Sequence, residues 1–217
     1  MTRFASPSSA TAAAAADPSA AAKLLAEHLF YDPDLRPYAA VDGAAAKGLL
    51  ALLRKHNPPH VCLYRGELPQ DVAEVAPYLI ELQPDEPVTQ AILEQGWGKH
   101  WGIFALTRVD LREMRKHCRT FLMVNDPDGK PLYFRYYDPR VLRSFLPLCN
   151  TREAATIFGP VHSYFVEAED GSIVKLRLHD TSRLPIGEPV TRPPQFTAPA
   201  SGAAADGAAG NGRRGQY

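Results

Sequence analysis

Apolar and polar side chains follow two rhythms along this chain, one typical of helices and the other typical of strands. Helical spacing predicts helices over 19–30, 44–56, 87–95 and 152–158, and two more that begin at Asp110 and Asp138. Alternating or continuous apolar runs predict strands over 38–41, 61–64, 78–82, 101–106, 121–124, 132–137, 161–168 and 172–179. Polar turns at 125–130 and 169–171 join the last four strands into two hairpins.

The order of these elements predicts the fold class. Strands and helices alternate in the first half of the chain, whereas antiparallel hairpins dominate the second half. This order is typical of an α/β (α+β) fold, in which helices pack on a mixed β-sheet. The same pattern is compatible with one body or with two lobes.

The two ends of the chain differ in composition from its middle. Residues 1–18 are mostly Ala, Ser and Pro, and almost no large apolar residue follows Phe196. Such segments bury too little apolar surface to offset the entropy cost of ordering them. We therefore predict a disordered leader over 1–18, a folded domain over 19–180 and a disordered Pro/Gly/Ala tail over 181–217.

Charge and cysteine content narrow the class of partner. Lys plus Arg and Asp plus Glu each total 24, so the formal net charge is zero, which disfavours nucleic acid and anionic membranes. No apolar run approaches the roughly 20 residues of a membrane span, and the N-terminal stretch lacks the apolar core of a signal peptide. Cys62, Cys118 and Cys149 are widely spaced among apolar neighbours, as buried thiols of a reducing compartment are. The sequence thus predicts a cytoplasmic protein that binds proteins or small molecules.

Residues capable of catalysis or metal binding are present, but their spacing suits neither role. His117 and Cys118 are adjacent, so on a helix their side chains point to different faces, and no G-x-S-x-G motif occurs. His56, His60 and Cys62 are zinc-ligand types, but two prolines separate the histidines and no second cluster supplies a fourth ligand. We expect no catalytic residue, no metal and no cofactor; the alternative is a small metal-dependent or cysteine hydrolase.

Two features are candidates for contact with a partner protein. Trp97 lies in a Gly-rich stretch, where it either packs under a loop or anchors a partner. Arg112, Arg115, Lys116 and Arg119 form a basic stripe on the polar face of the helix that begins at Asp110. Such a stripe is either a solvated helix face or a surface for an acidic partner.

The most distinctive segment is 133–140, Tyr-Phe-Arg-Tyr-Tyr-Asp-Pro-Arg. Asp138 precedes a proline, so it can cap a helix whose first position is that proline. Arg135 or Arg140 can then pair with Asp138 or with a carboxylate on a partner. We take Arg135, Tyr137, Asp138 and Arg140 as candidate partner-binding residues, and predict that Asp138 is structural and that Arg140 contacts the partner.

The block Arg-Tyr-Tyr-Asp-Pro-Arg at 135–140 resembles the signature of the type VI secretion effector chaperones, also called Tap or TEC adaptors (domain of unknown function 4123). Four further blocks occur in that family's order: Tyr-Ala-Ala-Val-Asp-Gly-Ala at 38–44, Ala-Pro-Tyr-Leu-Ile-Glu-Leu at 76–82, Trp-Gly at 101–102 and Phe-Gly-Pro-Val at 158–161. The resemblance covers about 38–165, which is most of the predicted folded region.

This resemblance implies a bacterial cytoplasmic adaptor without catalytic residues. Such an adaptor binds a toxin effector, often at the effector's N-terminal region, and helps to load it onto the secretion spike protein. A structural subunit of the secretion machine is the remaining alternative.

Overall fold

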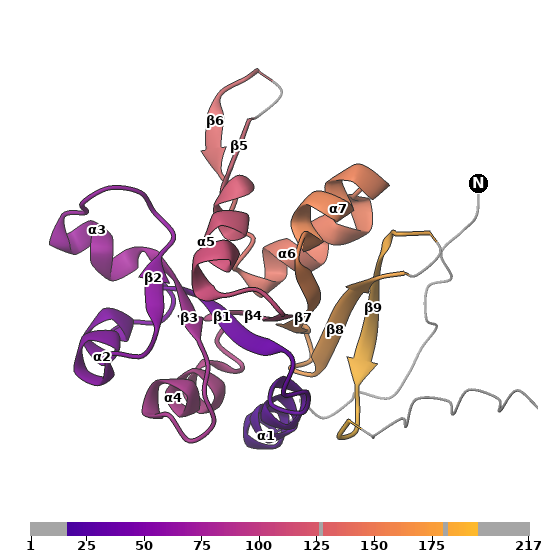
Figure 1. Cartoon of the computed structure of the whole chain (residues 1–217), viewed down its shortest axis with the longest axis horizontal. Helices are drawn as coiled ribbons and strands as arrows, with labels where there is room; N and C mark the ends of the chain where they lie inside the picture. Colours follow the sequence, from indigo (N-terminus) through magenta and orange to yellow (C-terminus); the bar gives the residue numbers. More distant parts are fainter. Residues whose placement is uncertain (1–16, 126–127, 180–181, 195–217) are drawn as a thin grey trace, which may run out of the picture.

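A seven-stranded sheet forms the centre of the fold in the computed structural model, which describes residues 17–125, 128–179 and 182–194 (Figure 1). The strands lie in the order β2-β3-β1-β4-β7-β8-β9, and each neighbouring pair is antiparallel. Their bounds are β1 Arg36–Asp42, β2 His60–Cys62, β3 Pro77–Glu81, β4 Gly102–Thr107, β7 Val161–Glu167, β8 Ile173–Leu178 and β9 Pro185–Val190. Two further strands, β5 Met123–Asn125 and β6 Pro131–Tyr133, pair only with each other among the strands of the described residues.

Helices cover both faces of the sheet. Figure 1 shows α1, α2 and α4 on one side and α5, α6 and α7 on the other. The helices are α1 Pro18–Leu29, α2 Leu49–His56, α3 Gln70–Val75, α4 Pro87–Gly96, α5 Leu111–Thr120, α6 Pro139–Phe145 and α7 Thr151–Phe158, with a 3₁₀ turn η1 at Leu146–Leu148. Each face of the sheet therefore has a hydrophobic core of its own.

Strand β1 contributes to both cores. Tyr38 and Ala40 belong to one buried cluster, while Ala39 and Val41 belong to the other. Successive side chains of a strand point to opposite faces, so a strand covered on both sides needs apolar residues at every position. This double burial explains the continuous apolar run at the start of the domain.

The predicted α+β class is confirmed, but the sheet is antiparallel throughout rather than mixed. The apolar pattern does not determine strand direction, since a strand buried on both faces reads as an apolar run in either direction. The predicted hairpin over 161–179 is confirmed as β7 and β8. The predicted hairpin over 121–137 is shorter than expected, because Phe121, Leu122, Tyr136 and Tyr137 are buried outside its two strands.

Helix α2 begins at Leu49, five residues later than the predicted start at Ala44. Asp42 instead holds a turn, because its carboxylate accepts a hydrogen bond from the Ala44 N–H at 2.9 Å. Gly48 then has a φ of 84°, in the left-handed region that glycine adopts most easily. Helix α3 was not predicted, and none of its residues is fully buried, so the sequence carried no apolar stripe to reveal it.

The predicted C-terminal tail is wrong for Pro185–Val190, which form the edge strand β9. Arg177 on β8 pairs with Glu188 on β9, with 2.8 Å between Nη2 and Oε1. Pro185 and Pro189 hid this strand in the sequence, although proline is compatible with an edge strand. Residues 1–16 of the predicted leader and 195–217 of the predicted tail lie outside the described residues.

Candidate protein-binding surface

The segment 135–140 begins α6 and caps it. The Asp138 carboxylate accepts a hydrogen bond from the Arg140 N–H at 3.0 Å, and Pro139 occupies the first turn. Asp138 is buried. The predicted capping role of Asp138 is therefore confirmed.

Arg140 turns back onto the same carboxylate. Its Nε and Nη2 donate to Asp138 Oδ1 at 3.0 Å and Oδ2 at 2.7 Å, although 58% of the Arg140 side chain is exposed. Burial favours a higher pKa for Asp138, but the hydrogen bonds from Arg140 outweigh it and hold the pKa below its ordinary value. Two N–H groups of the Arg140 guanidinium are thus already bound to Asp138 within the chain. A contact between Arg140 and a partner stays a prediction.

Arg135 and Tyr137 connect this segment to β1. The Arg135 guanidinium donates to the buried Asp42 carboxylate, which also holds the turn before α2. Tyr137 is 2% exposed, and burial, followed by its interaction with Tyr64, raises its pKa. Tyr137 therefore presents almost no surface to a partner, whereas half of the Arg135 side chain does face solvent.

The segments of the family-like blocks meet around Asp42. The Gly43 N–H donates to the Ala76 carbonyl at 3.0 Å, and a Cβ at Gly43 would lie only 2.5 Å from that oxygen. A Cβ at Gly102 would likewise lie 2.2 Å from the Ala40 carbonyl. These glycines are required by close backbone approach, and the blocks 38–44, 76–82, 101–102 and 135–140 form a packed junction rather than an open site.

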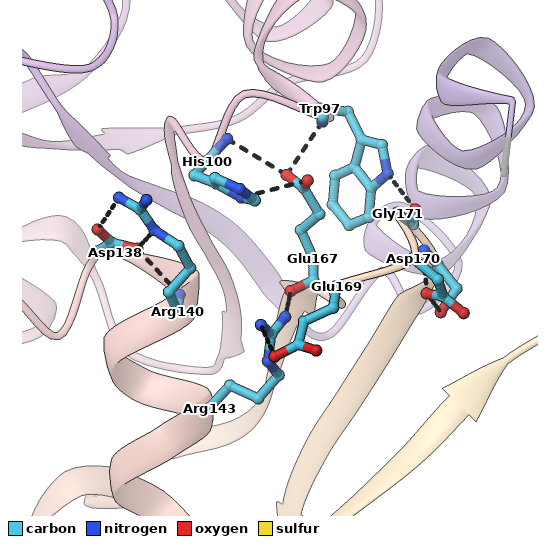
Figure 2. A network of polar contacts seen from close by, with 11 residues as sticks. Trp97, His100, Asp138, Arg140, Arg143, Glu167, Glu169, Asp170 and Gly171 are labelled. Carbon is cyan, nitrogen blue, oxygen red and sulfur yellow. Dashed lines mark hydrogen bonds and ion pairs between the residues drawn. The ribbon is translucent and has the colours of Figure 1, made fainter. Parts of the chain in front are cut away.

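A second polar network lies beside the start of α6 (Figure 2). The buried Glu167 carboxylate accepts from the Gly98 N–H at 3.0 Å and the His100 N–H at 3.4 Å, and His100 Nδ1 lies 3.3 Å from its other oxygen. Arg143 on α6 donates to the Glu167 carbonyl and, at 3.4 Å, to Glu169. The network fastens the turn after α4 to β7 and α6.

Trp97 belongs to this buried region and not to the surface. It is 5% exposed, and its indole N–H donates to the Gly171 carbonyl at 2.9 Å (Figure 2). It also lies against Phe104, with ring centroids 6.2 Å apart. Of the two interpretations of Trp97, packing under a loop is the one that the structure supports.

Exposed apolar side chains gather on the β5–β6 hairpin. Four of the eight large apolar side chains exposed in the described residues lie there: Met123, Val124, Leu132 and Tyr133. Figure 1 shows the hairpin projecting from the body beyond α5. Clustered exposed apolar side chains are typical of surfaces that bind other proteins.

A groove of about 640 Å³ lies at the base of this hairpin. Its lining residues come from the segment between β2 and α3, from α3, from the end of α5 and from the hairpin: Leu63, Tyr64, Arg65, Leu68, Val72, Arg119, Thr120, Leu122, Met123 and Tyr133. Tyr64 and Tyr133 meet across it with ring centroids 5.0 Å apart. We call this the hairpin groove.

The basic stripe of α5 is divided by the fold. Arg112 is exposed, whereas Arg119 reaches back to the segment after β2, where its guanidinium donates to the carbonyls of Cys62, Leu63 and Tyr64. Burial, and then the like charges of Arg115 and Arg65, lower the pKa of Arg119. Arg65, Arg115, Lys116 and Arg119 line a pocket of about 220 Å³, which shares Arg65 and Arg119 with the hairpin groove.

The cysteine and histidine side chains considered above for catalysis or metal binding are placed as structural residues. Burial raises the pKa of the Cys118 thiol to about 12, and His117 contacts the Ile157 carbonyl at 3.0 Å. His60 Nδ1 lies 2.7 Å from the Pro58 carbonyl. In residues 17–125, 128–179 and 182–194, no three His, Cys, Asp or Glu side chains are grouped as metal ligands would be, so His56, His60 and Cys62 do not form such a group.

The sequence predicted the basic stripe of Arg112, Arg115, Lys116 and Arg119, but it gave no sign of Arg65 or of the groove. Arg65 is separated from α5 by 46 positions or more and joins the stripe only through tertiary packing. The apolar content of 132–133 was visible, but strands with that pattern are usually half-buried.

None of the helices in the described part of the chain is long and apolar enough to cross a membrane.

One of the three comparisons with known proteins found a match. No curated protein and no solved structure shows a significant match to the chain. The family model Domain of unknown function (DUF4123) matches residues 37–156, more than half of the 217 residues, and this range includes the junction, α5, the hairpin and α6. The chain belongs to the DUF4123 family.

Proposed function

We propose that this protein is a cytoplasmic adaptor that binds a type VI secretion toxin effector and helps to load it onto the secretion spike protein. The observation that carries the proposal is the β5–β6 hairpin, which exposes four large apolar side chains beside an open groove. Membership of the DUF4123 family and the resemblance of 135–140 to the effector-chaperone signature support it.

The structure is compatible with a holding function that needs no chemistry. The hairpin follows α5, which packs on the antiparallel sheet, and the packed junction around Asp42 joins that sheet to the segment before α6. Protein partners bind such surfaces through a few large apolar or aromatic anchors. In this proposal the bound partner is a toxin, and the hairpin is part of its contact surface.

Co-purification tests the proposal. The tagged full-length chain is co-expressed with the toxin and with the spike protein encoded beside its gene, each in turn and then together. We expect the toxin to be retained at a fixed stoichiometry, and the spike protein to be retained when the toxin is present. Retention of neither protein would contradict the proposal, and a spike contact of constant stoichiometry without toxin would favour a structural subunit instead.

A further inference from the structure

The hairpin groove continues into a cluster of cations. Arg65 and Arg119 line both the groove and the basic pocket, so the apolar wall formed by Leu68, Val72 and Tyr133 passes directly into positive charge. A ligand that fills the groove with apolar side chains therefore ends beside guanidinium groups.

These cations are not neutralised within the described residues. Arg65, Arg115, Lys116 and Arg119 form no ion pair with a carboxylate there. The four side chains line one pocket, where burial, followed by the like charges of Arg115 and Arg65, lowers the pKa of Arg119. Gathering like charges in this way is unfavourable, and an anionic group bound nearby relieves the repulsion.

One donor in the cluster also lacks a partner. Arg115 Nε is shielded from solvent and has no hydrogen-bond partner among the described side chains and backbone groups. A buried donor without an acceptor costs free energy, so the chain itself does not satisfy the hydrogen-bonding capacity of Arg115. The chain thus offers apolar contact on one side and unmatched positive charge on the other.

We infer that the hairpin groove and its basic pocket bind an acidic amphipathic segment of the toxin, with large apolar side chains in the groove and neighbouring carboxylates on Arg65, Arg115 and Lys116. This inference rests on the proposed function, and it deepens that function by naming the chemistry of the bound segment. The apolar anchors supply most of the affinity, and the charges fix register and speed association.

The test measures the affinity of the purified full-length chain for the purified toxin encoded beside its gene, and for overlapping synthetic peptides that cover that toxin. Tyr133→Asp removes an exposed anchor, and Arg65→Glu/Lys116→Glu reverses the charge of two exposed cations. The matched controls are Leu148→Asp, at an 81% exposed apolar position in η1, and Lys47→Glu/Lys55→Glu, which makes the same change in net charge at two exposed positions before and on α2.

We expect each groove variant to weaken toxin binding about tenfold or more and each control to change it less than about twofold. The peptide that binds should contain carboxylates beside large apolar residues, and its affinity should fall as salt is raised. Reversing its carboxylates to lysine should restore binding to the Arg65→Glu/Lys116→Glu variant.

Two outcomes overturn the inference in different ways. If the toxin binds and the groove variants bind as well as the controls, the inference is wrong and the proposed function stands. If the unmodified chain does not bind the toxin at all, both fail. Circular dichroism and thermal unfolding of each variant separate lost binding from lost folding.

Discussion

The junction around Asp42 and the β5–β6 hairpin differ in burial: side chains are buried at the junction and exposed on the hairpin. At the junction, Asp42 and Tyr137 are buried, and glycine is required where backbones touch. On the hairpin, Tyr133 is 58% exposed, and the two strands form a separate sheet of two in the part of the chain that the structure describes. The residues that resemble the family signature thus hold the fold together, whereas the surface suited to a partner lies just before them in the chain.

A sequence signature can mark the residues that build a fold or the residues that contact a partner, and the two need not coincide. A block such as 135–140 identifies the fold because its side chains cap α6 and bind β1. It does not by itself mark the contact surface, because most of its members are buried. Mutations at the junction should therefore reduce stability, and mutations on the hairpin should reduce binding.

The largest loss of stability is expected for Asp42→Ala. This change leaves Arg135 and the Ala44 N–H without their acceptor, at a cost of about 2 kcal/mol or more in the free energy of unfolding. Chemical denaturation measures the effect. Arg36→Ala, which breaks a surface pair with Glu81, should cost less than about 1 kcal/mol, and equal losses for the two variants would contradict the account.

Removal of β9 should have the next largest effect. A chain that ends at Leu184 loses the strand that pairs along β8, as well as the Arg177–Glu188 ion pair. We expect its Tm to fall by roughly 3–6 °C relative to a chain that ends at Pro194, which corresponds to about 1–2 kcal/mol for a domain of this size. Identical melting curves for the two truncations would show that β9 does not contribute.

Asp138→Ala should cost about 1 kcal/mol, the usual value of a lost helix cap, and Asp138→Asn should recover much of it. The pKa of Asp138 lies below its ordinary value of 3.8 in the folded protein. Its stabilisation is therefore complete above about pH 4 and is lost as the pH falls through the folded-state pKa. The stability curves of the unmodified protein and Asp138→Ala should converge at low pH, and a constant gap down to that range would argue against an ionised cap.

The smallest effect on stability is expected on the hairpin. Tyr133→Ala and Met123→Ala each remove an exposed side chain, so the free energy of unfolding should change by less than about 0.5 kcal/mol. Thermal unfolding of both variants, alongside Asp42→Ala, checks this. A loss above about 2 kcal/mol would mean that the hairpin is part of the core and that the comparison drawn above is wrong.

Local chemistry was the part of the structure that the sequence predicted best. The cap at Asp138, the burial of Cys118 and the β7–β8 hairpin each depend on neighbouring residues, and each is confirmed. Strand direction, the edge strand β9 and the approach of Arg65 to α5 depend on contacts between distant segments. A hydrophobic pattern does not carry that information, so these features required the three-dimensional structure.

The same limit applied to the candidate site. Trp97, Tyr137 and Asp138 are residue types that favour interfaces or ion pairs, and their types alone do not distinguish a partner from the protein's own interior. The structure gives each of them an intramolecular contact. Residues that sequence reasoning passed over, such as Met123 and Leu132, keep their exposed surface.

Amide hydrogen exchange of the full-length chain, with and without the bound toxin, tests the central claim most directly. Exchange slows where a partner covers the backbone or stabilises it against local opening. We predict that toxin binding slows exchange in 123–125, 131–133 and 64–72, with little change in 36–42, which is already protected within the sheet. Protection confined to 139–145, with the hairpin unchanged, would place the contact surface on α6 and contradict the account.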